Sequence, residues 1–157
     1  MSDETSNENW LHSEMIVCPH CHHQLYRVDR SPMCDEWLLY CNQCAGRVEV
    51  SYYNPEVQAF RDEIGKETGS SAREAYIALR RAIEVRLKPC SCGGQYQFNA
   101  PRRCHICQGV VIADDSGVDL WPEIAGIEND PTPEEAALYE QFDAEYVRHD
   151  ANEGIWK

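Results

Sequence analysis

The chain carries four tight cysteine pairs, Cys18-Pro19-His20-Cys21, Cys41-Asn42-Gln43-Cys44, Cys90-Ser91-Cys92 and Cys104-His105-Ile106-Cys107. Two pairs on separate turns supply the four sulfur ligands of a tetrahedral metal site. Thiols of cytosolic proteins stay reduced, so paired cysteines in a chain without a secretion signal favour metal over disulfides. Grouped in sequence order, the pairs predict two sites: Cys18, Cys21, Cys41 and Cys44 in the first, and Cys90, Cys92, Cys104 and Cys107 in the second.

These pairs resemble the zinc ribbon superfamily, in which two knuckles joined by β-strands hold one zinc ion. The resemblance implies a fold and two structural Zn²⁺ ions, but no activity, because zinc ribbons serve many unrelated proteins. The spacing favours zinc, and iron in a four-cysteine site stays open. Structural zinc contributes roughly 10–16 kcal/mol of apparent binding free energy in finger peptides, so we expect both modules to lose their structure without metal.

Other potential ligands lie beside the pairs. His20, His22, His23 and His105 could replace a cysteine, but two complete sets predict that they are exposed polar residues. Cys34 is the ninth and unpaired cysteine, which we expect to be a small, partly buried apolar residue that is dispensable for metal binding.

Patterns between the pairs predict the remaining elements. Alternation places Val48, Val50 and Tyr52 on one face of a strand, and Asn54-Pro55 is typical of a helix start. Ser71-Ala72-Arg73-Glu74 forms a capping box ahead of a second helix, whose apolar stripe is Tyr76, Leu79, Ile83 and Leu87. Short strands are expected at residues 95–98 and 110–112.

The predicted fold is small α+β, with two zinc ribbons joined by a helical connector and a C-terminal acidic helix. Thr132-Pro133-Glu134-Glu135 is a further capping box, followed by Leu138, Phe142 and Tyr146 one turn apart. The expected divisions are a disordered N-terminus at 1–15, zinc ribbon 1 at 16–53, the helical connector at 54–88, zinc ribbon 2 at 89–112, and an acidic aromatic C-terminal region at 113–157 with a helix at about 133–149.

Charge is distributed unevenly along the chain. The formal net charge is −13, and residues 113–157 contain thirteen acids and two bases, whereas residues 18–112 contain ten acids and twelve bases. An acidic surface repels phosphates and attracts basic proteins. We therefore expect the C-terminal region to bind a basic protein, through Asp114, Asp115, Asp119, Trp121, Glu134, Glu135, Tyr139, Glu140, Phe142, Asp143 and Glu145.

No pair of nucleophile and base, no phosphate loop and no open metal site is evident, so the sequence predicts a binding protein and not an enzyme. In size, acidity and expected location the chain is similar to the immunity proteins, or antitoxins, that block basic bacterial nuclease toxins. The alternative is a zinc-ribbon transcription or RNA-processing factor that binds nucleic acid through Arg80, Arg81, Arg86, Lys88, Arg102 and Arg103.

A weaker alternative is a thiol-disulfide oxidoreductase that uses Cys18 and Cys21, because Cys-Pro-His-Cys matches an active-site tetrapeptide of enzymes resembling thioredoxin.

The location of the protein in the cell is predicted from two further features of the sequence. The first nine residues are acidic and polar, and no run approaches the roughly 20 apolar residues that span a bilayer. We expect a cytoplasmic protein that does not insert into membranes.

Overall fold

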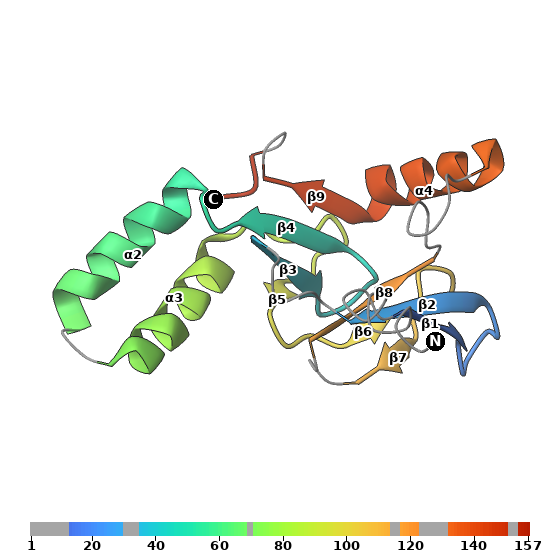
Figure 1. The fold of residues 1–157 in the computed structure, drawn as a ribbon, viewed down its shortest axis with the longest axis horizontal. Helices are drawn as coiled ribbons and strands as arrows, with labels where there is room; N and C mark the ends of the chain where they lie inside the picture. The colour runs from blue at the N-terminus through green and yellow to red at the C-terminus, as the bar shows by residue number, and fades with distance from the viewer. Residues whose placement is uncertain (1–12, 30–34, 69–70, 114–116, 123–131, 151–153) are drawn as a thin grey trace, which may run out of the picture.

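The computed structural model confirms the small α+β class (Figure 1). Within the ranges that it describes there are three helices and three small sheets, and none of those helices is both long and apolar enough to cross a bilayer. The structure describes residues 13–29, 35–68, 71–113, 117–122, 132–150 and 154–157.

Among the described residues, the first and the last elements are strands, and the helices α2 and α3 form a pair in the middle. The first strands belong to two hairpins, and the last strand follows the C-terminal helix directly. In chain order the elements are β1 (Ser13–Val17), β2 (Gln24–Asp29), β3 (Glu36–Cys41), β4 (Arg47–Ser51), α2 (Pro55–Thr68), α3 (Ala72–Arg86), β5 (Tyr96–Gln97), β6 (Arg102–Arg103), β7 (Val110–Ile112), β8 (Val118–Trp121), α4 (Pro133–Tyr146) and β9 (Val147–His149).

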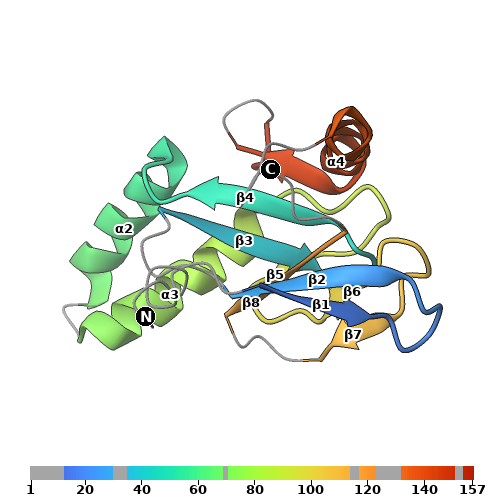
Figure 2. The same ribbon diagram turned by 45° about the vertical axis from the view of Figure 1, so that its right-hand side comes forward.

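Sheet connectivity joins distant parts of the chain (Figure 2). One sheet has the order β1-β2-β8, a second has the order β5-β3-β4-β9, and β6 pairs with β7. All pairings are antiparallel except the one between β4 and β9. The predicted C-terminal region therefore contributes a strand to each of the two larger sheets.

β3 is buried on both faces, which explains its unbroken apolar sequence. Trp37, Leu39 and Cys41 face a core made with α2 and α3, whereas Leu38 and Tyr40 face a smaller core that includes Trp121. The alternation predicted for β4 is confirmed, because Val48 and Val50 join the same core as Trp37.

The helical connector forms as the capping patterns predict. The Asn54 side chain accepts a hydrogen bond from the backbone N–H of Glu56 at the start of α2, and the Ser71 hydroxyl accepts one from the N–H of Glu74 at the start of α3. Leu79 and Ile83 of α3 are buried. The pair lies at one end of β3 and β4 (Figure 1).

The predicted C-terminal helix is present and begins at its capping box, but it ends three residues earlier than expected. Val147 takes up an extended conformation, and β9 pairs with β4 over Val147–His149. The backbone groups of these residues are satisfied by a neighbouring strand, so the helix stops where pairing with β4 begins.

The prediction of disorder over residues 1–15 is wrong for its last three residues, which open β1 and pair with β2. A half-buried strand usually alternates apolar residues on its buried face with polar residues on its exposed face. Here the exposed positions carry apolar Met15 and Val17, so the sequence lacks that alternation. Residues 1–12 lie outside the described residues.

Candidate metal centres

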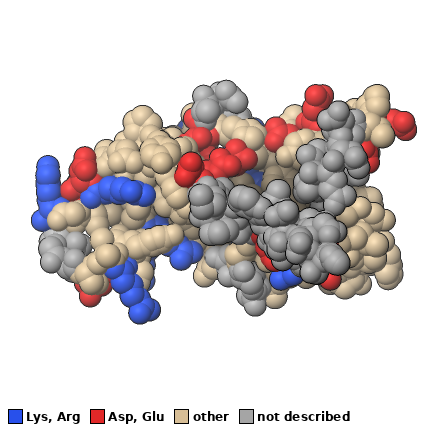
Figure 3. All heavy atoms as spheres, viewed as in Figure 1, with Lys and Arg blue, Asp and Glu red and all other residues tan. Residues whose placement is uncertain are grey.

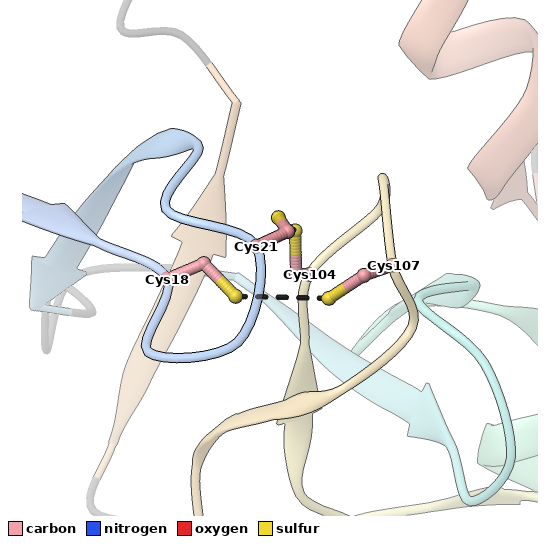
Figure 4. Close-up of side chains that lie close together, drawn as sticks. All are labelled: Cys18, Cys21, Cys104 and Cys107. Carbon is pink, nitrogen blue, oxygen red and sulfur yellow. Dashed lines mark hydrogen bonds between the residues drawn. The ribbon is translucent and has the colours of Figure 1, made fainter.

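The eight paired cysteines form two four-sulfur clusters, but the sequence-order grouping is wrong. The first pair lies beside the fourth, and the second lies beside the third, so one cluster is nested within the other along the chain. In each cluster the four sulfur atoms lie within 4.8 Å of one another, and Figure 4 draws the cluster that contains Cys18 and Cys104. The outer centre is Cys18, Cys21, Cys104 and Cys107, and the inner centre is Cys41, Cys44, Cys90 and Cys92.

Strand pairing explains the nested grouping. β3 ends at Cys41, and its pairing with β5 sets Cys41 opposite Tyr96 and so brings the Cys90 pair to the inner centre. β8 continues the chain from β7 and pairs with β2, so the β6–β7 hairpin with its Cys104 pair lies against the β1–β2 hairpin. The pairing of the strands, and not closeness in the sequence, therefore decides which cysteine pairs share a metal centre.

The two turns of the outer centre have the same backbone geometry. In the first, the N–H of Cys18 donates to the carbonyl of His23, five residues on, and the N–H of His22 donates to the carbonyl of Cys18. The second turn repeats both bonds, from Cys104 to the carbonyl of Gly109 and from Gln108 to Cys104. A left-handed residue, His22 or Gln108, closes each turn, with φ of 66° and 63°.

The inner centre accommodates its shorter pair by shortening the turn. The N–H of Cys41 donates to the carbonyl of Gly46, five residues on, whereas the N–H of Cys90 donates to the carbonyl of Gly94, only four residues on. Gly93 has φ of 98°, where glycine is favoured. Cys-x-Cys therefore presents two sulfurs just as Cys-x-x-Cys does, with one residue removed from the loop.

The sulfur spacing fits a tetrahedral metal ion. In the outer centre 3.7 Å separates the Cys18 and Cys107 sulfurs and also the Cys21 and Cys104 sulfurs. Two sulfur pairs of the inner centre are 3.5 Å and 3.6 Å apart. Zn–S bonds of about 2.3 Å give a tetrahedron with edges of about 3.8 Å, whereas a disulfide requires about 2.05 Å. Each centre can therefore hold one metal ion.

Backbone N–H groups point at the sulfurs and favour their thiolate form. The N–H of Gln43 lies 3.3 Å from the Cys41 sulfur, and that of His20 lies 3.4 Å from the Cys18 sulfur. Hydrogen bonding to Cys41 lowers the pKa of the Cys90 thiol, and the same bond raises the pKa of Cys41. Neighbouring thiols in such a cluster therefore differ in how readily each loses its proton. A bound cation displaces the protons of all of them.

The structure leaves no room for a side chain at Gly94, and this predicts a selective defect. A Cβ atom there would lie 2.6 Å from the Cys41 sulfur and 2.9 Å from Oδ1 of Asn42. Gly94→Ala should therefore weaken metal binding at the inner centre by roughly 10- to 100-fold, the equivalent of about 1–3 kcal/mol of overpacking. Competition with a chromophoric chelator measures this as earlier release of one of two ions.

Gly65→Ala is the matched control, because a Cβ at Gly65 in α2 would meet nothing within 4 Å. It should leave metal affinity unchanged and stabilise the chain by about 0.5–1 kcal/mol, since alanine favours helix over glycine. Equal chelator resistance of Gly94→Ala and the unmodified chain would contradict the geometry of the inner centre.

The neighbouring histidines are not among the clustered ligand atoms of the described residues. Nε2 of His20 lies 2.9 Å from the carbonyl oxygen of Val110 across the outer centre. His22 and His23 are exposed, as predicted, whereas burial lowers the pKa of half-buried His105 to about 4. Cys34 lies outside the described residues, and its dispensability stays a prediction.

α4 is fixed beside the outer centre. The Tyr146 hydroxyl donates to the carbonyl of His105 at 3.0 Å. His149 in β9 has one ring nitrogen 2.7 Å from Glu49 and the other 3.0 Å from Asp143. Burial alone lowers the pKa of His149, but the two carboxylates outweigh it and the pKa is raised. These bonds tie α4 to the turn between β6 and β7 and to the edge formed by β4 and β9.

The predicted partner-binding residues divide by accessibility. Asp119 is buried and accepts a hydrogen bond from Tyr40. Phe142 is buried, and Trp121 and Tyr139 are half-buried and stacked on each other, so these three belong to the packing between α4 and β8. Leu138, predicted on the packed stripe, is 57% exposed. The exposed acids of α4 are Glu134, Glu140 and Glu145, with Glu135 and Asp143 half-buried; Asp114 and Asp115 lie outside the described residues.

Sequence reasoning missed a buried cluster of charged groups between the two larger sheets. Arg47 is 1% exposed, and its guanidinium donates to the Tyr40 hydroxyl and to the carbonyl oxygens of Leu120 and Ala45. The Tyr40 hydroxyl in turn donates to Asp119 at 3.0 Å. Charged residues are mostly exposed, so nothing in the sequence pattern marked this cluster.

The basic patch proposed to bind nucleic acid has fewer exposed side chains than the sequence predicts. Arg102 is fully buried and donates to the carbonyl oxygens of Val118 and Ala100. Arg103 is half-buried and donates to the carbonyl of Gln108. Arg102 is therefore withdrawn from the surface on which nucleic acid would bind, whereas Arg103 keeps part of its side chain exposed.

Comparison with known proteins identifies a family for most of the chain. A family model described as Domain of unknown function (DUF8255) matches residues 14–113. That span contains all eight clustered cysteines together with α2 and α3, whereas β8, α4 and β9 follow it. No curated protein and no solved structure matches the chain.

Proposed function

We propose that this chain, which belongs to the DUF8255 family, is a zinc-stabilised protein-binding module of the cytoplasm that presents an acidic helix to a basic protein partner. Zinc is the metal in both centres, and its role is structural. In its most specific form the proposal makes the chain an immunity protein, or antitoxin, whose partner is a basic nuclease toxin.

Complete ligand sets support a binding role over an enzymatic one. Each centre already supplies four sulfurs, and a catalytic zinc ion keeps one position open for water or substrate. The pairing of Cys18 with Cys107 and of Cys21 with Cys104 also commits the Cys-Pro-His-Cys tetrapeptide to the outer centre. This disfavours a thiol-disulfide oxidoreductase, which needs that pair free to form its own disulfide.

Charge distribution is the observation that carries the proposal. α4 contains five acidic residues and no Lys or Arg. Figure 3 shows Asp and Glu side chains over α4 at one end of the molecule, whereas Lys and Arg are mixed with Asp and Glu over α2 and α3 at the other. A face of one sign accelerates encounter with a partner of opposite sign and excludes nucleic acid phosphates.

The proposal is tested with the protein encoded immediately upstream, where the gene of a cognate toxin is expected. Binding to the zinc-loaded chain is measured at several salt concentrations for two triple variants. Glu134→Gln, Glu140→Gln and Glu145→Gln together should slow association about tenfold at low salt and flatten the salt dependence, because these carboxylates are exposed on α4. The toxin's nuclease activity should fall on binding of the unmodified chain.

The matched control makes the same charge change on α2, with Glu56→Gln, Asp62→Asn and Glu63→Gln, all of them exposed. It should associate nearly as fast as the unmodified chain. Equal effects of both variants would reject α4 as the binding surface, and tight binding to a DNA or RNA oligonucleotide would favour the transcription or RNA-processing alternative. Point variants are required because a chain ending at Ile112 would lack β8 and β9.

A further inference from the structure

A groove of about 450 Å³ lies between α4 and the outer centre. One wall is formed by the Cys104 turn, through His105 and Ile106, with His23 beside it. The opposite wall is α4, and Phe142 and Tyr146 line the groove between the two. The Tyr146 hydroxyl donates a hydrogen bond to the carbonyl of His105 at 3.0 Å, and this bond joins α4 to the Cys104 turn.

Each wall of the groove carries an exposed aliphatic side chain. Ile106 is 56% exposed and Leu138 is 57% exposed, although they come from elements 32 residues apart. Both line the groove, whose floor adds the aromatic ring of Phe142. Apolar side chains that converge on one concavity are typical of a site that receives an apolar group.

The charges around the groove select the occupant. Its lining contains the carboxylate of Glu145 and no Lys or Arg. The same helix adds exposed Glu134 and Glu140 and has no base. A segment that buries an apolar side chain here therefore binds more favourably when it also carries positive charge.

We infer that this groove is the docking site for a basic, amphipathic segment of the partner protein, which inserts one large aliphatic or aromatic side chain between Ile106 and Leu138. The inference rests on the proposed function, since the acids of α4 attract the segment and the groove anchors it. Anchoring side chains dominate the dissociation rate of such interfaces, whereas the surrounding charges mainly set the association rate.

Synthetic peptides test the groove directly on the full zinc-loaded chain. The probes are an amphipathic peptide of lysine and leucine, and a peptide with the same lysines in which serine replaces every leucine. The leucine peptide should bind about tenfold or more tightly than the serine peptide. Leu138→Ser should abolish most of that preference, and Ile106→Ser should do the same, provided that the protein still holds two zinc ions.

Val85→Ser is the matched control, because Val85 in α3 is 67% exposed and lies outside the groove lining. It should keep the full preference for the leucine peptide. Equal binding of the two peptides, or equal effects of Leu138→Ser and Val85→Ser, would overturn the proposal that the groove is a docking site. The proposal that the acids of α4 bind a basic partner would still stand. Failure of both lysine peptides to bind would instead reject the proposed function itself.

Discussion

Replacing Cys18 and Cys104 together with serine should leave the chain holding one zinc ion, whereas replacing Cys18 and Cys41 together should leave it holding none. The first pair of residues belongs to a single centre, so the other centre survives. The second pair removes one ligand from each centre. The sequence-order grouping predicts the reverse for both double variants, so the zinc-to-protein ratio decides between the two arrangements.

The expected effect is large because structural zinc supplies much of the folding free energy of small modules, roughly 10–16 kcal/mol for each ion in finger peptides. The Cys18/Cys104 variant should keep the core around β3, α2 and α3, since the inner centre packs against that core through Cys41 and Cys90. The Cys18/Cys41 variant should lose ordered structure, and circular dichroism would detect the loss.

Cys34→Ser is the control for thiol loss alone, because two sets of four are complete without it. It should keep both zinc ions. Elemental analysis on the same samples separates zinc from iron. One retained ion in the Cys18/Cys41 variant would contradict the nested arrangement, and iron in place of zinc would contradict the metal assignment.

The nested arrangement shows what cysteine spacing alone can predict. The spacing correctly identified which eight residues cluster, because a tight pair on a turn is a local feature. Four pairs can combine in three ways, and the spacing does not choose among them. The choice is made by β5, a strand of two residues that pairs with β3 across the whole helical connector. Such short, long-range pairing leaves no periodicity in the sequence.

Helix boundaries were predicted well because their causes are local. Capping side chains at Ser71 and Thr132 satisfy backbone N–H groups three residues on, and both helices begin there. The end of α4 was not predicted, since it depends on pairing of β9 with β4. β3 was overlooked because burial on both faces replaces alternation with a continuous apolar run.

Buried charges were the least predictable feature of the chain. Asp119 was assigned to a partner surface and Arg102 to a basic patch, since most acids and bases are exposed. Both contribute instead to the contact between the two larger sheets, around Tyr40. Their burial depends on aromatic rings and carbonyl groups supplied by distant strands, which no local pattern reveals.

Arg47 should be the residue outside the metal centres whose loss costs most. Its guanidinium lies 4.6 Å from the ring centroid of Tyr40, 4.8 Å from that of Trp121 and 4.9 Å from that of Phe142. It therefore joins β3 and β4 to β8 and α4 through both hydrogen bonds and cation–π contacts. Removing it leaves a cavity among the rings and an unpaired carbonyl group at Leu120.

Arg47→Ala should lower the free energy of unfolding by about 3–5 kcal/mol, the cost of breaking a buried charged network and opening a cavity. Arg47→Met should cost less, because it keeps most of the volume, but it cannot satisfy the Leu120 carbonyl. Arg81→Ala, at an exposed position on α3, should change stability by no more than about 0.5 kcal/mol. Urea unfolding at a fixed free zinc concentration gives all three values. If Arg47→Ala unfolds at the same urea concentration as Arg81→Ala, the guanidinium does not hold the sheets together.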